Sequence, residues 1–571
     1  MNVSEKNKKL IFFLFSTLYV VASQLINKSF FVPLIEHIGS ENKAYQYPQT
    51  GLTLENDMLS KVFCRFFACA VACVFLYALC RWFLFLSQTW KSQNQIRKYI
   101  IILAVANLFA ILFLICLYPQ PISLSPDTYY NYVYARAWLP MYWHGFLTNV
   151  IYCASMIIFP HPFSMTLLPC LFAINLFGYF IYCTLIKRNK RGLLWALLFT
   201  VFLFLMPETI QIATFVGRNY MYAIVCFSFL CIILLDNLEQ RTLTASKCIV
   251  LSVLLGVLMT WRTEGILWLP FFPFLVYFTY FHKKNVTNVL KKYFVMTLLI
   301  LVSHSILNVP VKYGNEKYQD SDYFIINLPG PLSAVLNNPN ANLTYNGAED
   351  DLATIDSVVP IEYIKKYGEF GSITYNYDNG RVSRQCDAGD QGTEFVAASY
   401  NLLFHNLDIY LKFQTNLFCE SLFLPIPFDV PYEEGPWHIT EKSAETYNFI
   451  MNYYSIGERD INQFHGITFI NTKIDQFADF LFLTLLSYEY ILTGWIKLLT
   501  TLAVLLICIH ALIRKRWVYF FTGGALLGIL FAIILTAPTA RSNYYFYPFF
   551  CQYWLIMFYI IEIKHKPHPS M

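Results

Sequence analysis

The sequence predicts an all-α polytopic membrane protein, and three observations carry that prediction. Of the 571 residues, 57% are hydrophobic and 13% are charged, whereas about a quarter of a soluble domain is charged. Apolar runs of about 20 residues, the length that crosses a bilayer as a helix, recur along the chain. Aromatic residues make up 18% of the chain, which suits the aromatic belts at the membrane surfaces. A soluble enzyme is therefore excluded, and the small net charge of +5 argues against a nucleic-acid partner.

Residues 1–98 are expected to hold two membrane helices. Lys8 and Lys9 precede an apolar run at about 10–26, and the positive-inside rule places these lysines in the cytoplasm. The run has no clear small-residue cleavage site, so we expect it to remain as the first span. A second run at 62–88 returns the chain to the cytoplasm.

Residues 99–309 are expected to form the core, and their first span leads outward into an external loop at 118–163. Within that loop, the apolar run 146–159 could either cross the membrane or lie along its outer surface. A crossing would place the basic cluster that begins at Lys187 outside, against the positive-inside rule. We therefore expect 126–160 to form one or two interfacial amphipathic helices.

The remaining spans alternate in direction between basic turns. They are expected at 164–186, 192–206, 219–235, 245–261, 266–281, 292–309, 493–513, 517–536 and 544–563. Residues 310–485 are polar and are expected to form an external domain of mixed secondary structure, and 486–571 hold the C-terminal spans. The sum is about twelve crossings with both termini cytoplasmic, in an integral multi-pass protein.

One acidic residue stands where the third span is expected to meet water. Asp127 ends a Ser-Pro-Asp triplet, and a carboxylate at that border has the tunable pKa that a general base needs. The triplet is also a helix-start signal, so a capping role for Asp127 is the alternative. Tyr129, Tyr130, Trp143 and His144 follow in the same loop.

Several cations are also expected at the outer ends of spans. They are Arg136, Arg218, Arg262 and Arg541. Ionisable residues at membrane depth are costly, and they tend to be functional or paired. The alternatives are arginine side chains that reach up to lipid head groups and, for Glu264, an ion pair with Arg262. One loop carboxylate beside several arginines is what a lipid-borne phosphate next to a general base requires.

Four short motifs in this order resemble those of GT-C membrane glycosyltransferases. They are Tyr-Trp-His-Gly at 142–145, Arg-Thr-Glu-Gly at 262–265, Leu-Pro-Gly-Pro-Leu at 328–332, and Arg541 followed by Tyr544, Tyr545, Tyr547 and Pro548. More narrowly, the chain is similar to bacterial relatives of protein O-mannosyltransferases and of the lipid A aminoarabinose transferase. Gly145 is a departure, because a His-Pro or Pro-Pro pair often follows the acidic loop in those relatives.

This resemblance implies a GT-C-like fold and a transferase of the EC 2.4 type. The enzyme would move a sugar from a polyprenyl-phosphate donor to a cell-envelope glycan or lipid-linked acceptor, with inversion, on the outer face of a bacterial inner or plasma membrane. The partners implied are that donor, that acceptor and membrane lipid. No cofactor is required; a divalent metal fits the class, but no clustered ligands demand one.

The resemblance also assigns roles to individual residues. Asp127 would be the general base. Arg262 and Arg541 would bind the donor phosphate, with Arg218 and His144 as weaker candidates. Glu264, Tyr129, Tyr130, Trp143 and Tyr544 would support the acceptor or the structure of the site.

Two other functions fit a chain with many spans. A transporter or flippase of lipid-linked saccharides would place charges at mid-membrane and use broken helices. An O-antigen polymerase or ligase would rely on arginines and histidines of a large external loop. The sequence leaves open the sugar, the acceptor, the length of the lipid carrier, metal dependence, oligomeric state and whether Cys386 pairs with Cys419.

Overall fold

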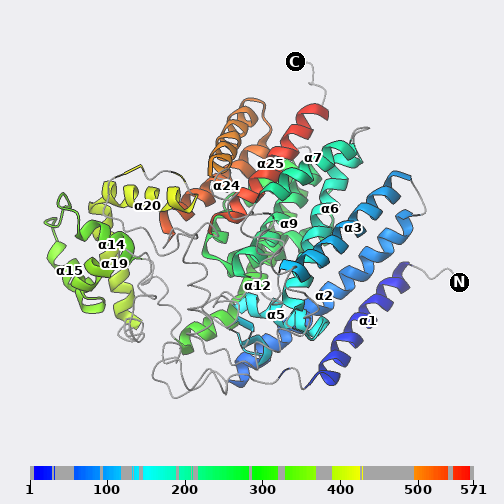
Figure 1. Ribbon diagram of the computed structural model, residues 1–571, viewed down its shortest axis with the longest axis horizontal. Helices are drawn as coiled ribbons and strands as arrows, with labels where there is room; N and C mark the ends of the chain where they lie inside the picture. The colour runs from blue at the N-terminus through cyan, green and yellow to red at the C-terminus, as the bar shows by residue number, and fades with distance from the viewer. Residues whose placement is uncertain are drawn as a thin grey trace.

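The computed structural model is helical throughout the residues it describes. These are 5–28, 31, 57–90, 94–117, 131–132, 134–140, 146–161, 163–187, 192–206, 209, 217–281, 286–318, 328–367, 389–422, 424, 427–428, 494–537 and 544–565. No strand occurs among them. A bundle of long helices makes up most of the structure, and a smaller group of short helices lies to one side of it (Figure 1).

Eight helices in the described part of the chain are long and apolar enough to cross a membrane. They are Asn7–Ile26, Met58–Leu84, Ser164–Ile186, Arg218–Glu239, Val289–Gly314, Gly494–Ile513, Trp517–Thr536 and Phe546–Lys564. The prediction of an α-helical polytopic membrane protein is therefore confirmed. The count of about twelve crossings stays a prediction, because the other apolar helices are shorter.

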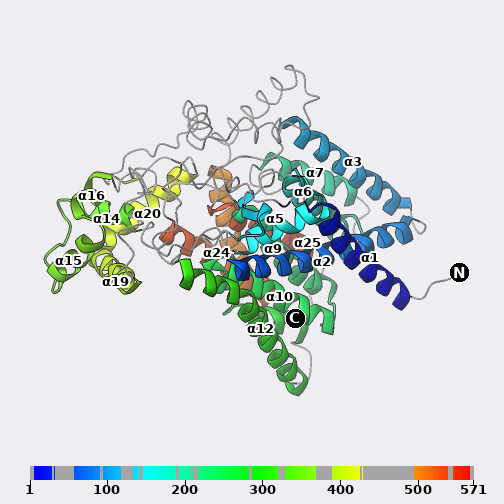
Figure 2. The ribbon, with the colours of Figure 1, turned by 90° about the horizontal axis from the view of Figure 1, so that it is seen from below.

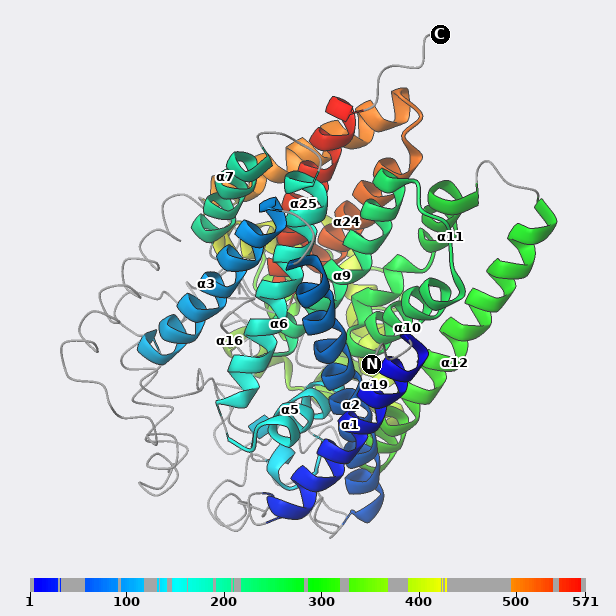
Figure 3. The same ribbon diagram turned by 90° about the vertical axis from the view of Figure 1, so that its right-hand side faces the viewer.

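The N-terminal helices pack around a short apolar helix. α1 (Glu5–Ile26) and α2 (Met58–Trp90) meet α5 (Phe146–Ile158), a helix of 13 residues. Thirteen residues span only about 20 Å, less than a bilayer core of about 30 Å. The Tyr19 hydroxyl donates to the carbonyl oxygen of Ile158 at 2.6 Å, so α5 lies near the C-terminal end of α1 (Figure 3). The interfacial position expected for the loop stays a prediction.

α9 (Arg218–Glu239) is the central helix of the bundle, and the depth of its neighbours can be judged from their contacts with it. The other bundle helices are α3 (Asn94–Leu117), α6 (Ser164–Ile181) with η5 (Tyr182–Ile186), α7 (Gly192–Leu205), α10 (Ala245–Trp261), η6 (Thr263–Trp268), α11 (Phe272–Val276), η7 (Tyr277–Phe281), α12 (Val286–Tyr318), α24 (Trp517–Thr536) and α25 (Phe546–His565). Near its C-terminal end, the buried Asp236 carboxylate accepts hydrogen bonds from Lys247 and Tyr280, both at 2.7 Å.

Contacts at the two ends of α9 show how far its neighbours reach. At the N-terminal end, Arg262 donates to the side-chain oxygen of Asn219. Asn219 and Asp236 lie 17 positions apart, which is about 26 Å along a helix. Lys247 and Arg262 stand near the two ends of α10 and contact the two ends of α9, so α10 extends over this whole distance. The broken segment from Arg262 to Tyr280 does the same. Both short segments therefore extend nearly as far as α9, which is itself a candidate span.

The helices beside the bundle form a domain with its own core. They are α14 (Pro329–Leu336), α15 (Ala348–Val358), α16 (Ile361–Tyr367), α19 (Gly389–His405) and α20 (Leu407–Ser421) (Figure 2). Leu332, Ile355, Phe395 and Phe413 are buried together in that core. α20 joins the domain to the bundle, because the Tyr410 hydroxyl donates to the carbonyl oxygen of Leu535 at the end of α24.

One boundary of the segment 310–485 differs from the expectation. α12 extends to Tyr318, so the expected boundary at 309 falls inside a helix. The described residues of the segment are helical, and its expected mixed secondary structure stays a prediction for the rest. Pro310 removes one backbone hydrogen bond but does not end α12, as is tolerated in apolar helices with close neighbours.

The contact between α10 and α12 predicts a position where a single methyl group is destabilising. A Cβ atom on Gly256 would lie 3.0 Å from the Ser303 Cβ and 3.2 Å from the His304 nitrogen, whereas nothing lies within 4 Å of one on Gly528. We expect Gly256→Ala to cost about 1–3 kcal/mol through overpacking. Gly528→Ala is the matched control and should be neutral or stabilising, because alanine favours helix. Thermal unfolding in detergent tests this, and equal midpoints for both variants would contradict the packing.

Candidate functional site

Arg262 is the centre of the polar site at the N-terminal end of α9. α10 ends at Trp261, and Arg262 takes an extended backbone (φ −140°, ψ 144°) before η6 begins. Gly265 makes the following turn possible, because a Cβ there would lie 2.0 Å from the Leu258 carbonyl oxygen. This close approach explains the glycine of the Arg-Thr-Glu-Gly motif. The Arg262 side chain is thereby turned into the bundle and is only 7% exposed.

The Arg262 guanidinium is held by two side chains. Its Nε and Nη2 donate to the two carboxylate oxygens of Glu264 at 3.1 and 2.7 Å, which is a bidentate pair. Its Nη1 donates to the Asn219 oxygen at the start of α9. Three of the five N–H groups of an arginine are thus engaged by these partners. The ion pair with Arg262, stated above as the alternative for Glu264, is what the structure contains.

Three tyrosine rings surround this guanidinium. Its carbon lies 5.8 Å from the ring centres of Tyr222 and Tyr547 and 6.0 Å from that of Tyr544. These distances are within the range of cation–π attraction. The hydroxyls of Tyr222 and Tyr547 are buried and have no hydrogen-bond partner among the described residues. The site therefore combines a fixed cation with hydroxyl groups whose hydrogen-bonding capacity is unused there.

The ion pair shifts the pKa of both Glu264 and Arg262. Burial alone would raise the pKa of the Glu264 carboxyl, but the Arg262 charge and its hydrogen bonds lower it to about 2, with a smaller contribution from Arg218. Burial would likewise lower the pKa of the Arg262 guanidinium, and the Glu264 charge raises it instead. Both groups are therefore charged at neutral pH, so Glu264 is unsuited to act as a general base there.

α5 connects this site to the external loop. The Trp261 indole N–H donates to the Thr148 hydroxyl at 3.1 Å. On the next residue of α5, the Asn149 amide donates to the Asn131 carbonyl oxygen at 3.0 Å. Asn131 follows Asp127 by four positions. The segment that carries the expected base is thus tied, through α5, to the residue next to Arg262.

The domain of short helices and the C-terminal helices also reach this region. Phe418 of α20 packs edge-on against Tyr545, with ring centres 5.2 Å apart. Lys497, on the helix Gly494–Ile513, is 1% exposed, and its ammonium lies 5.7 Å from the Phe546 ring centre. Sequence reasoning did not single out Lys497, although a lysine within an apolar run is itself a signal. It also missed Asn219 and Tyr222, which only the packing brings to Arg262, and it gave Tyr547 only as part of the Arg541 motif.

The predicted site residues divide into two groups. Arg262, Glu264 and Tyr544 lie together, and Arg218 lies beside Asn219 at the start of α9. Asp127, Tyr129, Tyr130, Trp143, His144 and Arg541 lie outside the described residues, as does Cys386. Arg136 is buried, and it donates to the Tyr132 hydroxyl at 3.2 Å within its own segment.

Among the described residues, no group of three or more histidine, cysteine, aspartate or glutamate side chains could hold a metal ion. No family model, no curated protein and no solved structure matches the chain. The likeness of its motifs to GT-C enzymes therefore stays a prediction from the sequence.

The buried pair predicts unequal effects of removing one charge or both. Glu264→Gln should destabilise the protein by about 3–5 kcal/mol, because it leaves the Arg262 charge buried without its partner. Replacing both residues by glutamine should recover part of that loss. Asp408→Asn breaks an exposed pair with Lys412 on α20 and should cost about 0–1 kcal/mol. Thermal unfolding in detergent would measure the four proteins, and a double variant less stable than Glu264→Gln would contradict the pairing.

The lowered pKa of Glu264 predicts an acid-sensitive term in stability. The folded-state pKa is about 2 and the ordinary value is 4.5, so the ion pair stabilises the fold fully above about pH 4.5. This stabilisation should be lost as the pH falls from 4.5 through 2. The difference in unfolding midpoint between wild type and Glu264→Gln should therefore shrink over that interval. A difference that stays constant would show that the carboxylate is not selectively stabilised in the folded state.

Proposed function

We propose that this chain is a membrane glycosyltransferase that moves a sugar from a polyprenyl-phosphate donor to a glycan or lipid-linked acceptor on the outer face. The observation that carries the proposal is the buried, tyrosine-lined guanidinium of Arg262 at the end of the bundle. A departing lipid phosphate needs a fixed cation and hydrogen-bond donors in a site of low dielectric. The spare N–H groups of Arg262 and the hydroxyls of Tyr222 and Tyr547 have this chemistry.

The chain connections support the same site for the expected base and the second arginine. Asp127 precedes Asn131 by four residues, so covalent geometry keeps the two within about 14 Å. Arg541 precedes Tyr544 by three residues, a limit of about 11 Å. Asn131 is tied through α5 to Trp261, and Tyr544 contacts Arg262 directly. These chain connections are compatible with a proposed site that includes both expected groups.

The reaction can be written from these roles. The acceptor hydroxyl oxygen attacks the anomeric carbon, and the Asp127 carboxylate takes the hydroxyl proton. The bond between the anomeric carbon and the phosphate oxygen breaks as the glycosidic bond forms, with inversion. Polyprenyl phosphate leaves with the electron pair of the broken bond. Arginines near the site offset the negative charge that develops on the phosphate.

The ion pair between Arg262 and Glu264 affects which arginine would neutralise the phosphate and which would orient it. Glu264 already balances the charge of Arg262, so Arg262 would orient the phosphate through its remaining N–H groups rather than neutralise it. Neutralisation would then fall to Arg218, at the start of α9, and to Arg541. Arg262 and Glu264 would then act together, and a change of either residue would disturb the orientation of the phosphate.

A second candidate function is transport of a lipid-linked saccharide, and one observation favours it. The segment after Arg262 is a 3₁₀ turn, a short α-helix and a π-helical turn, with Pro270 before the α-helix and Pro273 in its first turn. Broken helices of this kind line substrate sites in many transporters. The buried Lys497 is a second charge within a membrane helix. Transport would move a lipid-linked sugar between vesicle leaflets without forming a glycosidic bond.

The expected base provides the test that separates these functions. Cells that lack the chain would be complemented with wild type, Asp127→Asn or the control Asp350→Asn, an exposed carboxylate in the first turn of α15. With equal membrane levels, Asp127→Asn should lower the modified glycan about 100-fold or more, as loss of a general base does. Mass spectrometry of envelope glycans measures this. Normal glycan from Asp127→Asn, or no glycan difference without the chain, would reject the proposal.

A further inference from the structure

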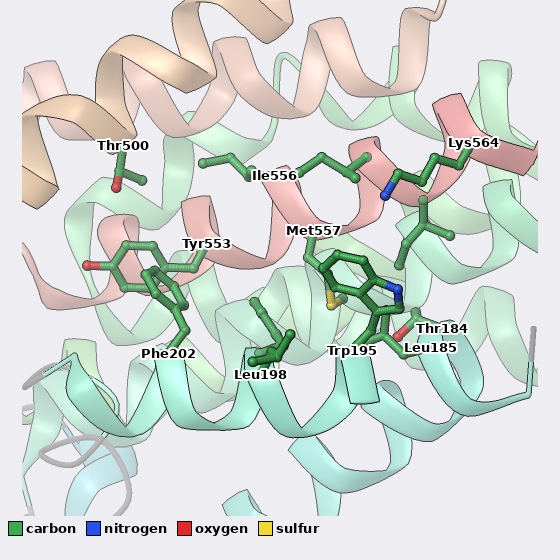
Figure 4. A pocket seen from close by; sticks show the side chains of 13 residues that line it. Thr184, Leu185, Trp195, Leu198, Phe202, Thr500, Tyr553, Ile556, Met557 and Lys564 are labelled. Atoms are coloured by element: carbon green, nitrogen blue, oxygen red, sulfur yellow. The ribbon is translucent and has the colours of Figure 1, made fainter. Parts of the chain in front are cut away.

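A groove on the flank of the bundle lies apart from the Arg262 site. It has a volume of about 360 Å³ and is formed by α7, η5, α25 and the helix Gly494–Ile513. Most lining side chains are apolar, among them Leu198, Phe202 and Met557. Figure 4 shows Lys564 at one end of the groove and Tyr553 with Phe202 toward the other. Leu198 and Trp195 are 52% and 45% exposed, so the groove opens sideways, toward the lipid phase of a membrane.

The length of the groove matches one leaflet. Along α25 it runs from Tyr553 to Lys564, a distance of 11 positions or about 16 Å. Half of a bilayer core is about 15 Å. One acyl chain of a phospholipid fills this depth, whereas a polyprenyl chain is longer than a leaflet is thick. The dimensions therefore favour an ordinary phospholipid tail.

The charge of the groove is confined to one end. The Lys564 ammonium lies 4.8 Å from the ring centre of Trp195, where it faces the groove mouth. Nearby, Lys187 forms an ion pair with Glu239 at 3.6 Å, and Asp236 binds Lys247. These charges mark the membrane border at the C-terminal ends of α9 and α25, which the basic clusters predict to be cytoplasmic. An anionic head group at this border would meet Lys564, and its tail would enter the apolar part.

We propose that this groove binds one anionic phospholipid of that leaflet, with its phosphate at Lys564 and one acyl chain between α7 and α25. The site is separate from the proposed sugar transfer, because Tyr547 and Lys564 lie 17 positions apart on α25, about 26 Å. The lipid would fill the space between α7 and the core of the bundle. It would therefore stabilise the position of α7.

Binding of defined lipids to the full chain tests this assignment. Protein in detergent would be mixed with phosphatidylglycerol or phosphatidylcholine of the same acyl chains, and bound lipid counted by native mass spectrometry. We expect one phosphatidylglycerol retained about tenfold more strongly than phosphatidylcholine. Lys564→Gln should abolish that preference, and Lys515→Gln, an exposed lysine at the same end of the bundle, should keep it. Leu198→Trp should displace both lipids, whereas Leu197→Trp, on the same helix but outside the groove, should not.

Three outcomes would overturn the proposal. Equal retention of the two lipids by wild type would mean that the groove takes any apolar chain. Unchanged preference in Lys564→Gln would mean that Lys564 and Trp195 only anchor the protein at the membrane surface. Displacement of phosphatidylglycerol by undecaprenyl phosphate would assign the groove to the sugar carrier instead. None of these results depends on glycan formation, so the proposal can fail while sugar transfer stands.

Discussion

The arrangement of the bundle depends on one constraint, which is that the Arg262 charge lies in an apolar interior and must be balanced there. Glu264 supplies the opposite charge two residues away, and the Asn219 side chain binds the remaining edge of the guanidinium. A buried ion pair is weak evidence for added stability, because desolvation offsets most of its attraction. Its effect is on specificity. α9, α10 and α25 must meet at one height for the charges and the tyrosine rings to be satisfied together.

A second polar cluster fixes the opposite end of the same helices. Asp236 receives Lys247 of α10 and Tyr280 of η7, while Asn237 donates to Glu562 of α25 at 3.0 Å. Most contacts between the two clusters are apolar, and the hydrophobic effect is not directional. The polar groups at both ends add directional contacts that fix the depth of each helix. This explains how the segment after Arg262 keeps its depth although it is broken by 3₁₀ and π turns and by two prolines.

The sequence predicts the membrane class and most helix positions well, because hydropathy and basic turns report directly on the bilayer. It also identifies Arg262 and Glu264, since charges at membrane depth are conspicuous. It does not identify Asn219 or Tyr222, because polar and aromatic residues are common near membrane surfaces and only packing selects these two. The short helices beside the bundle were not located from the sequence for a related reason. Their core residues, such as Phe395 and Phe413, are scattered among polar residues, so periodicity is weak there.

Arg262 is buried in the helix bundle and paired with Glu264, whereas the expected base and Arg541 belong to expected loop segments, and this difference affects how substrate specificity could evolve. The Arg262 unit is fixed by neighbours from several helices, so its geometry cannot adapt to different substrates. The expected base and Arg541 belong to chain segments that lead to Asn131 and Tyr544, and loops held by a rigid scaffold are where catalytic groups usually lie. On the proposed function, a change of acceptor would thus need new loops and no new bundle. α20 contacts Tyr545 close to the Arg262 site, so the same proposal gives the domain of short helices a role in selecting the acceptor.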